Sequence, residues 1–285
     1  YTSLYFVGAG GIGMSALVRY FLAKGYKVAG YDRTQSPLTT ELKTEGLEIV
    51  YEESVESIPD YCRNPETTLV VYTPAIPASH AGLVYFREHS FRVVKRAELL
   101  GLITQSSKGL CFAGTHGKTT TSSMAAHIFH ESPIGCNAFL GGILRNYNSN
   151  LILSEQSPFT VIEADEYDRS FHWLHPYMAV VTATDPDHLD IYGTEEAYLE
   201  SFARFTSLIQ PGGCLIMKKG IKLVPSVKEN VKIYTYSARD GGDFHAGNIR
   251  IGDGTIVFDF VMPEGSVADI ELGVPVEINI ENAVA

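Results

Sequence analysis

The chain has 285 residues and a net charge of −11, and 45% of its residues are hydrophobic, so it can form two domains, each with its own core. The acidic balance argues against a nucleic-acid surface, which would need a basic stripe, and favours small anionic ligands held by local loops. We find no signal peptide and no apolar run long enough to span a bilayer, and the four cysteines lack C-x-x-C spacing. We therefore expect a protein of the reducing cytoplasm with no membrane insertion, while its oligomeric state stays open.

The first motif is a glycine loop at the start of the chain. An apolar strand at residues 4–7 leads into Gly8-Ala-Gly-Gly-Ile-Gly13, and apolar residues then recur at helical spacing up to Gly25. This G-x-G-x-x-G pattern predicts a Rossmann-like parallel sheet whose loop backbone can approach a pyrophosphate. Asp32 ends the second predicted strand, where it would suit a ribose hydroxyl or simply cap the next turn.

Strands and helices continue to alternate through the first third of the chain. Ser36-Pro37 is typical of a helix start, and Gly46 marks the end of that helix. Further strands are predicted at residues 69–72 and 91–94, the latter followed by a helix through Ile103. The polar stretch that comes next predicts a domain boundary, with a first domain at residues 1–107 and a second at 108–285.

The second motif is a phosphate loop. A strand ends in Gly114-Thr-His-Gly-Lys-Thr119, in which loop amides can face phosphates, Lys118 can place a charge on β/γ oxygens and Thr119 can ligate Mg²⁺. Phe112 stands where the common P-loop pattern has its first glycine, so the loop is shorter, and an ordinary turn containing Gly-Lys-Thr is the alternative. We expect a P-loop α/β ATPase domain extended by a β-hairpin at about residues 249–260.

Carboxylates and a histidine follow two further strands of this domain. The strand at 159–162 leads to Glu163, and the strand at 178–182 leads towards His188. Because the carboxyl ends of parallel strands share one edge of a sheet, Glu163 and His188 should approach the phosphate loop. With Lys118, they are the candidate catalytic residues for phosphoryl transfer with ATP and Mg²⁺. A solvated acidic rim is the alternative.

Taken in order, the motifs resemble those of the Mur ligases. They are Gly8-Ala-Gly-Gly-Ile-Gly-Met-Ser15, Gly114-Thr-His-Gly-Lys-Thr-Thr120, Glu163-Ala-Asp-Glu-Tyr-Asp168, Asp187-His-Leu-Asp190 and Asn279-Ile-Glu-Asn282-Ala. The resemblance implies that the first domain binds the UDP of a UDP-sugar through Gly8, Gly10, Gly11, Ile12, Gly13, Asp32 and Thr73. It implies ATP contacts from Gly114, Thr115, His116, Gly117, Lys118, Thr119, Thr120, Asn279 and Asn282. It also implies that Mg²⁺ is served by Thr119, Glu163 and His188.

Within the family, the motifs are most similar to those of the branch that joins L-alanine to the lactyl carboxylate of UDP-N-acetylmuramate. The implied reaction proceeds through an acyl phosphate, in peptidoglycan precursor synthesis. Ile278 and Ala183 depart from a histidine and an asparagine that are usual in the family. The family continues into a third, amino-acid-binding domain, which is absent here, so we expect this fragment to bind substrates without ligating them.

Three other functions fit parts of the pattern. A nicotinamide-dependent oxidoreductase would use the first glycine loop but would leave the second unexplained. A regulatory P-loop module would bind nucleotide without chemistry. A murein peptide recycling ligase of the same family would attach a ready-made peptide in place of L-alanine.

Overall fold

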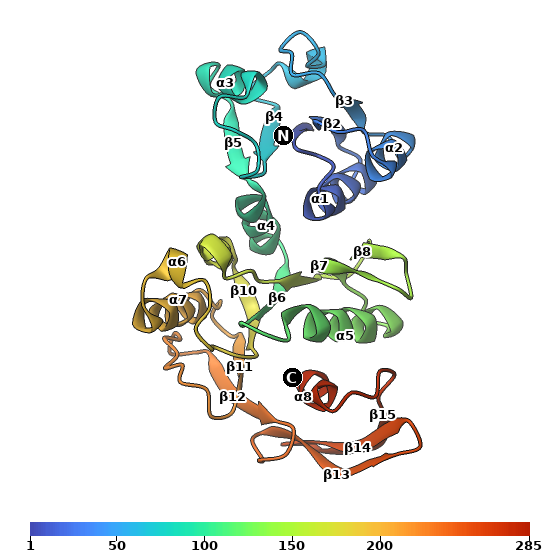
Figure 1. Cartoon of the computed structure of the whole chain (residues 1–285), viewed down its shortest axis with the longest axis vertical. Coiled ribbons are helices and arrows are strands. Elements are labelled where there is room, and N and C mark those ends of the chain that lie inside the picture. Colours follow the sequence, from blue (N-terminus) through green and yellow to red (C-terminus); the bar gives the residue numbers. More distant parts are fainter. The chain divides into compact units, whose positions relative to one another are not determined.

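The computed structural model describes residues 1–285, which form two compact units (Figure 1). Unit 1 comprises Tyr1–Leu102 and Gly141–Leu153, and unit 2 comprises Ile103–Leu140 and Ser154–Ala285. The predicted α/β class is confirmed, because sheets and helices alternate in both units. The linear division at residue 107 did not anticipate that residues 141–153 belong with the first unit, and the boundary itself stays a prediction.

Unit 1 is built on a five-stranded parallel sheet with the order β3-β2-β1-β4-β5. Its strands are β1 (Ser3–Val7), β2 (Lys27–Tyr31), β3 (Glu48–Val50), β4 (Thr68–Tyr72) and β5 (Arg92–Lys95). Its helices are α1 (Ile12–Ala23), α2 (Pro37–Thr44), the short 3-10 helix η1 (Asp60–Cys62), α3 (Ala81–Glu88) and α4 (Arg96–Gln105). All five residues of β1 are buried, as expected for a parallel strand covered on both faces. The glycine loop after β1 therefore lies where the strand order reverses, which is the usual ligand position in such sheets.

Helix starts in both units are capped by side-chain hydroxyls. Ser36 accepts a hydrogen bond from the amide of Thr39 at 3.2 Å, and Pro37 is the first residue of α2. Thr194 accepts one from the amide of Ala197 at 3.2 Å before α7. Each cap satisfies an amide that the first helical turn leaves without a partner, and the predicted helix start at Ser36-Pro37 is confirmed.

The second sheet is mixed and has the order β15-β14-β13-β12-β11-β10-β6-β9-β7-β8, of which the strands from β13 to β7 run parallel. Most of this sheet belongs to unit 2, whereas β8 and the end of β7 belong to unit 1. Its first strands are β6 (Lys108–Ala113), β7 (Asn137–Leu144), β8 (Ser149–Ile152), β9 (Phe159–Glu163) and β10 (Pro176–Val181). The later ones are β11 (Cys214–Lys218), β12 (Lys232–Ser237), β13 (Phe244–Gly252), β14 (Thr255–Met262) and β15 (Gly265–Glu271). The helices are α5 (Lys118–Glu131), η2 (Tyr167–Trp173), α6 (Leu189–Tyr192), α7 (Glu195–Ser207) and α8 (Ile278–Val284). Because β6 pairs with both β9 and β10, the carboxyl ends of these three strands are neighbours.

The predicted hairpin is confirmed as β13 and β14, which pair antiparallel with Gly252 opposite Thr255. Asp253 and Gly254 form the two-residue turn with φ of +51° and +76°. Positive φ at both central positions is typical of the tight turns that match the twist of a hairpin.

The helices and the cysteines add two findings. None of the helices combines the length and the apolar character needed to cross a membrane. All four cysteines are free, and burial raises the pKa of Cys62 to about 12 and that of Cys136 to about 11. A thiol held in its neutral form by burial is a poor nucleophile or metal ligand, so these two cysteines are core residues.

Candidate nucleotide site

The phosphate loop connects β6 to α5 and depends on two glycines with left-handed backbone. Gly114 has φ of +139° and Gly117 has φ of +84°, conformations that side chains with a Cβ rarely adopt. Gly114 is also packed tightly, because a Cβ there would lie 2.2 Å from Thr182 Oγ1 and 2.8 Å from the backbone nitrogen of Ala183. The glycine at position 114 is therefore required both by its φ and by the close approach of the chain that follows β10.

Hydrogen bonds join this loop to the end of β10 and to α7. The amide of Thr182 donates to the carbonyl of Ala113 at 3.0 Å, and its hydroxyl donates to the carbonyl of His116. The amide of Thr115 donates to the carbonyl of Ala183 at 3.1 Å, and its hydroxyl lies 2.9 Å from the hydroxyl of Tyr198. Neither Tyr198 nor Thr182 was selected from the sequence, so their contacts with the loop were missed.

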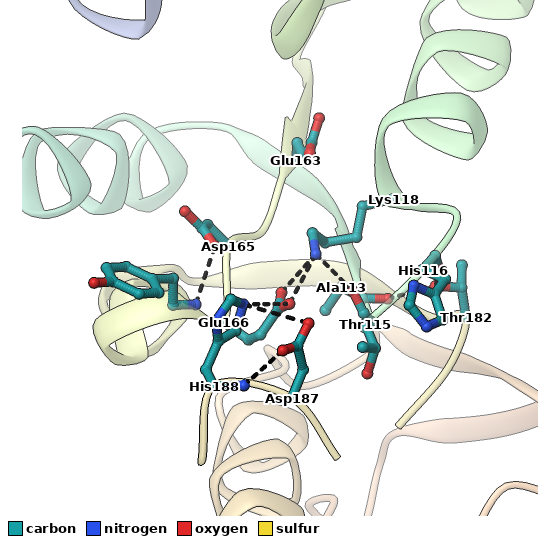
Figure 2. A network of polar contacts seen from close by, with 12 residues as sticks. Ala113, Thr115, His116, Lys118, Glu163, Asp165, Glu166, Thr182, Asp187 and His188 are labelled. Carbon is teal, nitrogen blue, oxygen red and sulfur yellow. Dashed lines mark hydrogen bonds and ion pairs between the residues drawn. The ribbon is translucent and has the colours of Figure 1, made fainter. Parts of the chain in front are cut away.

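Lys118, the first residue of α5, forms a buried ion pair with Glu166 (Figure 2). Its Nζ lies 2.9 Å from Glu166 Oε1 and 2.8 Å from Oε2, and it donates to the carbonyl of Gly114 at 2.7 Å. Glu166 is only 1% exposed. Sequence reasoning placed Glu166 among four acidic residues that follow β9 but did not select it. The signal that separates it from its neighbours is burial, which the sequence pattern does not reveal.

Thr119 and Glu163, which belong to different elements, lie together at the strand ends. The Thr119 hydroxyl donates to Glu163 Oε1 at 2.8 Å. A hydroxyl beside a carboxylate fits Mg²⁺, which prefers oxygen ligands and keeps several waters when phosphates supply the remaining ligands. The structure contains no group of three or more His, Cys, Asp and Glu side chains that could hold a metal ion by themselves. The metal roles of these residues stay predictions.

His188 lies on the other side of the Glu166 carboxylate from the loop lysine (Figure 2). Its Nε2 is 4.0 Å from Glu166 Oε1 and 3.7 Å from Asp187 Oδ2. Its backbone has φ of +52°, and its amide donates to Asp187 Oδ1 at 2.7 Å. Among the predicted catalytic residues, His188 and Lys118 are thus linked through Glu166, while Glu163 pairs with the Thr119 hydroxyl.

The asparagines of the last motif lie on α8, beside the phosphate loop. Asn282 donates from Nδ2 to Asn279 Oδ1 at 3.0 Å and accepts a hydrogen bond from the Thr121 hydroxyl at 3.4 Å. A Cβ at Gly117 would lie 2.8 Å from Asn282 Oδ1. The two asparagines are therefore placed near a nucleotide in the loop, and their contact with adenine stays a prediction. The His116 side chain is exposed and Thr120 is half-buried.

The glycine loop of unit 1 forms a second candidate site. Gly8 has φ of +90°, and a Cβ there would lie 2.5 Å from Thr73 Cγ2, so the ends of β1 and β4 meet closely. Asp32 Oδ2 accepts the amide of Gly10 at 2.7 Å, while its Oδ1 accepts the amide of Thr34 at 3.0 Å. Asp32 therefore orders the loop and caps the following turn, and its contact with a ribose stays a prediction.

The N-terminus of α1 completes this second site. Gly11 precedes the helix with open space around it, and the first helical residue, Ile12, is 51% exposed. Arg96 lies against the helix start, because a Cβ at Gly13 would be 2.5 Å from Arg96 Nε. Backbone amides at a helix start and a nearby guanidinium both favour a bound anion. Arg96 was not selected from the sequence.

A strand, a Gly-x-x-Gly-Lys-Thr loop and a helix at the carboxyl edge of a parallel sheet define a P-loop α/β protein. The chain matches the Mur ligase middle domain over residues 112–285 and the Mur ligase family, catalytic domain, over residues 3–108. It belongs to the Mur ligase family. The family resemblance seen in the motifs is thereby confirmed.

Its relatives include proteins named UDP-N-acetylmuramate–L-alanine ligase from Parabacteroides distasonis, 67% identical over 284 residues, and Phocaeicola vulgatus, 66% identical over 283 residues. Each alignment covers 62% of the relative and 100% or 99% of this chain, so the chain spans less than two thirds of these curated relatives. A UDP-N-acetylmuramate–alanine ligase structure from Thermotoga maritima superimposes with a TM-score of 0.80 at 24% identity, over all of this chain and 63% of that one. A UDP-N-acetylmuramate:L-alanyl-gamma-D-glutamyl-meso-diaminopimelate ligase from Neisseria meningitides gives a TM-score of 0.83 at 21% identity, over 99% of this chain and 91% of that one. At these identities the two structures support the fold alone.

Proposed function

We propose that this chain is the nucleotide-binding part of an ATP-dependent ligase that joins L-alanine to UDP-N-acetylmuramate. The observation that carries the proposal is the cluster of Lys118, Thr119 and Glu163 at the carboxyl ends of β6 and β9. The name of the 67% identical relative supports the choice of substrates. In this proposal unit 1 binds the UDP-sugar and unit 2 binds MgATP.

The proposed reaction transfers the γ-phosphoryl group of ATP to the lactyl carboxylate, giving an acyl phosphate and ADP. The amine of L-alanine then attacks the acyl carbon and forms the amide bond. The bond between that carbon and the bridging oxygen breaks, phosphate leaves with this oxygen, and the amine loses a proton. Such chemistry depends mainly on positioning and on stabilising charge. The loop amides hold the phosphates, and the Lys118 ammonium offsets the charge on the γ-phosphoryl group as it moves.

When bound, Mg²⁺ would offset negative charge on the phosphates. Thr119 and Glu163 would hold it with oxygen atoms, and the hydrogen bond between them keeps both side chains at the phosphate end of α5. His188, at the end of the loop that follows β10, is the third residue proposed to serve Mg²⁺. His116, whose side chain is exposed, is proposed only as an ATP contact of the loop.

Unit 1 supports a pyrophosphate ligand through the amides at the start of α1 and the Arg96 guanidinium. Two alternative functions can be tested against this proposal. A recycling ligase of the same fold would accept a tripeptide in place of L-alanine, and an oxidoreductase would bind NADH at the first glycine loop. The phosphate loop of unit 2 favours a ligase over an oxidoreductase, because hydride transfer would not use that loop.

The test combines binding with product formation. Calorimetry should show that residues 1–285 bind UDP-N-acetylmuramate and a non-hydrolysable MgATP analogue. Mass spectrometry should then find the alanyl product with this sequence extended to the length of its relatives, and no amide with residues 1–285 alone. A product formed only with the tripeptide would favour the recycling ligase. Absence of UDP-sugar binding would refute the proposal.

A further inference from the structure

The Lys118 ammonium is paired within the protein itself. Its Nζ donates to the Gly114 carbonyl at 2.7 Å and to Glu166 Oε1 at 2.9 Å, and it lies 2.8 Å from Glu166 Oε2, a buried oxygen that has no hydrogen-bond partner. Glu166 also neutralises the charge that the loop would otherwise offer to a phosphate. A nucleotide phosphate that takes this ammonium as its counter-ion must draw it away from the Glu166 carboxylate.

Glu166 is held in this position by its own backbone as well as by the lysine. The hydroxyl of Tyr192 donates to the carbonyl of Glu166, and the Ser201 hydroxyl lies 3.4 Å from the same Tyr192 oxygen. The residue is buried, and the Lys118 side chain is 15% exposed. A buried carboxylate with a fixed backbone is a permanent feature of the loop, in contrast to a surface glutamate that could turn away into solvent.

We propose that Glu166 is a further residue of the nucleotide site: an internal counter-ion of Lys118 that the nucleotide phosphate displaces. The inference rests on the proposed binding of MgATP and adds a residue that sets its affinity. The phosphate can displace the carboxylate because a polyphosphate carries more negative charge than one carboxylate and also accepts hydrogen bonds from the loop amides. The Gly114 contact can stay, since it uses only one of the three donors.

His188 is a second potential partner for the displaced Glu166 carboxylate. His188 Nε2 lies 4.0 Å from Glu166 Oε1, across the carboxylate from Lys118 (Figure 2). When the lysine moves to the phosphate, a small shift allows the His188 ring to donate to Glu166. Phosphate binding at the loop would then order the His188 side chain, which is one of the proposed catalytic groups, so Glu166 acts as a positioning residue.

The first experiment is calorimetric titration of residues 1–285 with a non-hydrolysable MgATP analogue and with adenosine. We expect Glu166→Gln to bind the analogue at least fivefold more tightly than wild type, because the competing charge is removed, and to bind adenosine unchanged. Asp165→Asn is the matched control: it removes a neighbouring charge whose Oδ1 accepts the Tyr167 amide at 3.0 Å and has no contact with Lys118. The control should change the affinity for the analogue less than twofold. A merely structural Glu166 would weaken both ligands together.

The outcomes separate this inference from the proposed function. If wild type binds no nucleotide, the proposed function fails and this inference fails with it. If wild type binds the analogue and Glu166→Gln binds it equally or more weakly, only the inference is overturned. Should Glu166→Gln not fold, a crystal structure of wild type with the analogue decides: the Lys118 Nζ should lie more than 4 Å from both carboxylate oxygens. A persistent ion pair would overturn the inference.

Discussion

Gly114→Ala should destabilise unit 2 strongly. The new Cβ would lie 2.2 Å from Thr182 Oγ1 and 2.8 Å from the Ala183 nitrogen. The hydroxyl cannot simply turn away, because it donates to the His116 carbonyl and lies 3.2 Å from that of Ala113. The Ala183 backbone is held by its carbonyl, which accepts the Thr115 amide at 3.1 Å. The methyl group can therefore be accommodated only by moving the loop or the strand end.

The magnitude follows from two costs. Alanine with φ near +139° is strained by about 1–3 kcal/mol, and overpacking of this kind adds about 1–3 kcal/mol. We expect the free energy of unfolding to fall by roughly 2–6 kcal/mol, a large part of the ~5–15 kcal/mol that a domain has. Affinity for MgATP should fall more than tenfold in the same variant, since the loop that holds the phosphates is displaced.

Guanidinium denaturation followed by tryptophan fluorescence measures this loss, because Trp173 is the only tryptophan of the chain and belongs to unit 2. The control is Gly220→Ala, in which φ is +84° and no atom lies within 4 Å of the added Cβ. That variant carries only the backbone cost, about 1–2 kcal/mol. If Gly114→Ala and Gly220→Ala lose the same stability, the close packing at Thr182 is unimportant and the reasoning is wrong.

Three other predictions concern binding and pH. Lys118→Ala should weaken MgATP binding at least tenfold, or about 1.4 kcal/mol, and equal affinities by calorimetry would contradict the ATPase interpretation. UDP-N-acetylmuramate should raise the melting temperature more than NADH at equal concentration, whereas the reverse order would favour an oxidoreductase. Burial lowers the pKa of His172 below its ordinary value of 6.5, so the unfolded chain takes up the proton first and stability should fall as pH drops below about 6.5. Denaturation at pH 7.5 and 5.5 tests this, and His172→Gln should show a smaller loss on acidification; a slope equal to that of wild type would exclude His172 as a cause.

Much of the fold could be predicted because its signals are local. Glycine spacing after an apolar strand requires a tight turn into a helix, and both such loops are present after β1 and β6. Capping residues and the Asp253-Gly254 turn act over two to four residues, which a sequence pattern can resolve. The approach of Thr119 to Glu163 followed from a general property of parallel sheets, whose carboxyl ends share one edge.

The parts that were missed depend on burial and on irregular backbone. Glu166, the acid that faces Lys118, directly precedes a short 3-10 segment. Within this segment Asp168 and Arg169 both have left-handed backbone, with φ of +49° and +56°. No periodic pattern encodes such a turn. The Thr182 contacts likewise arise only when β10 is placed beside β6. The association of residues 141–153 with unit 1 is a non-local contact that alternating hydrophobicity does not report.

That association has a consequence for how the chain folds as it is synthesised. The side chain of Asn150, on β8, is buried and donates from Nδ2 to the carbonyl of Ile12 at the start of α1 at 2.9 Å. Unit 1 therefore cannot be completed when residue 102 leaves the ribosome; it must wait until residue 153 has emerged, after β6 and α5 of unit 2. The usual order, in which the N-terminal unit folds before the next begins, is interrupted here. Nascent chains arrested with only residues 1–140 exposed should be cleaved by protease within α1, and chains exposing residue 153 should resist.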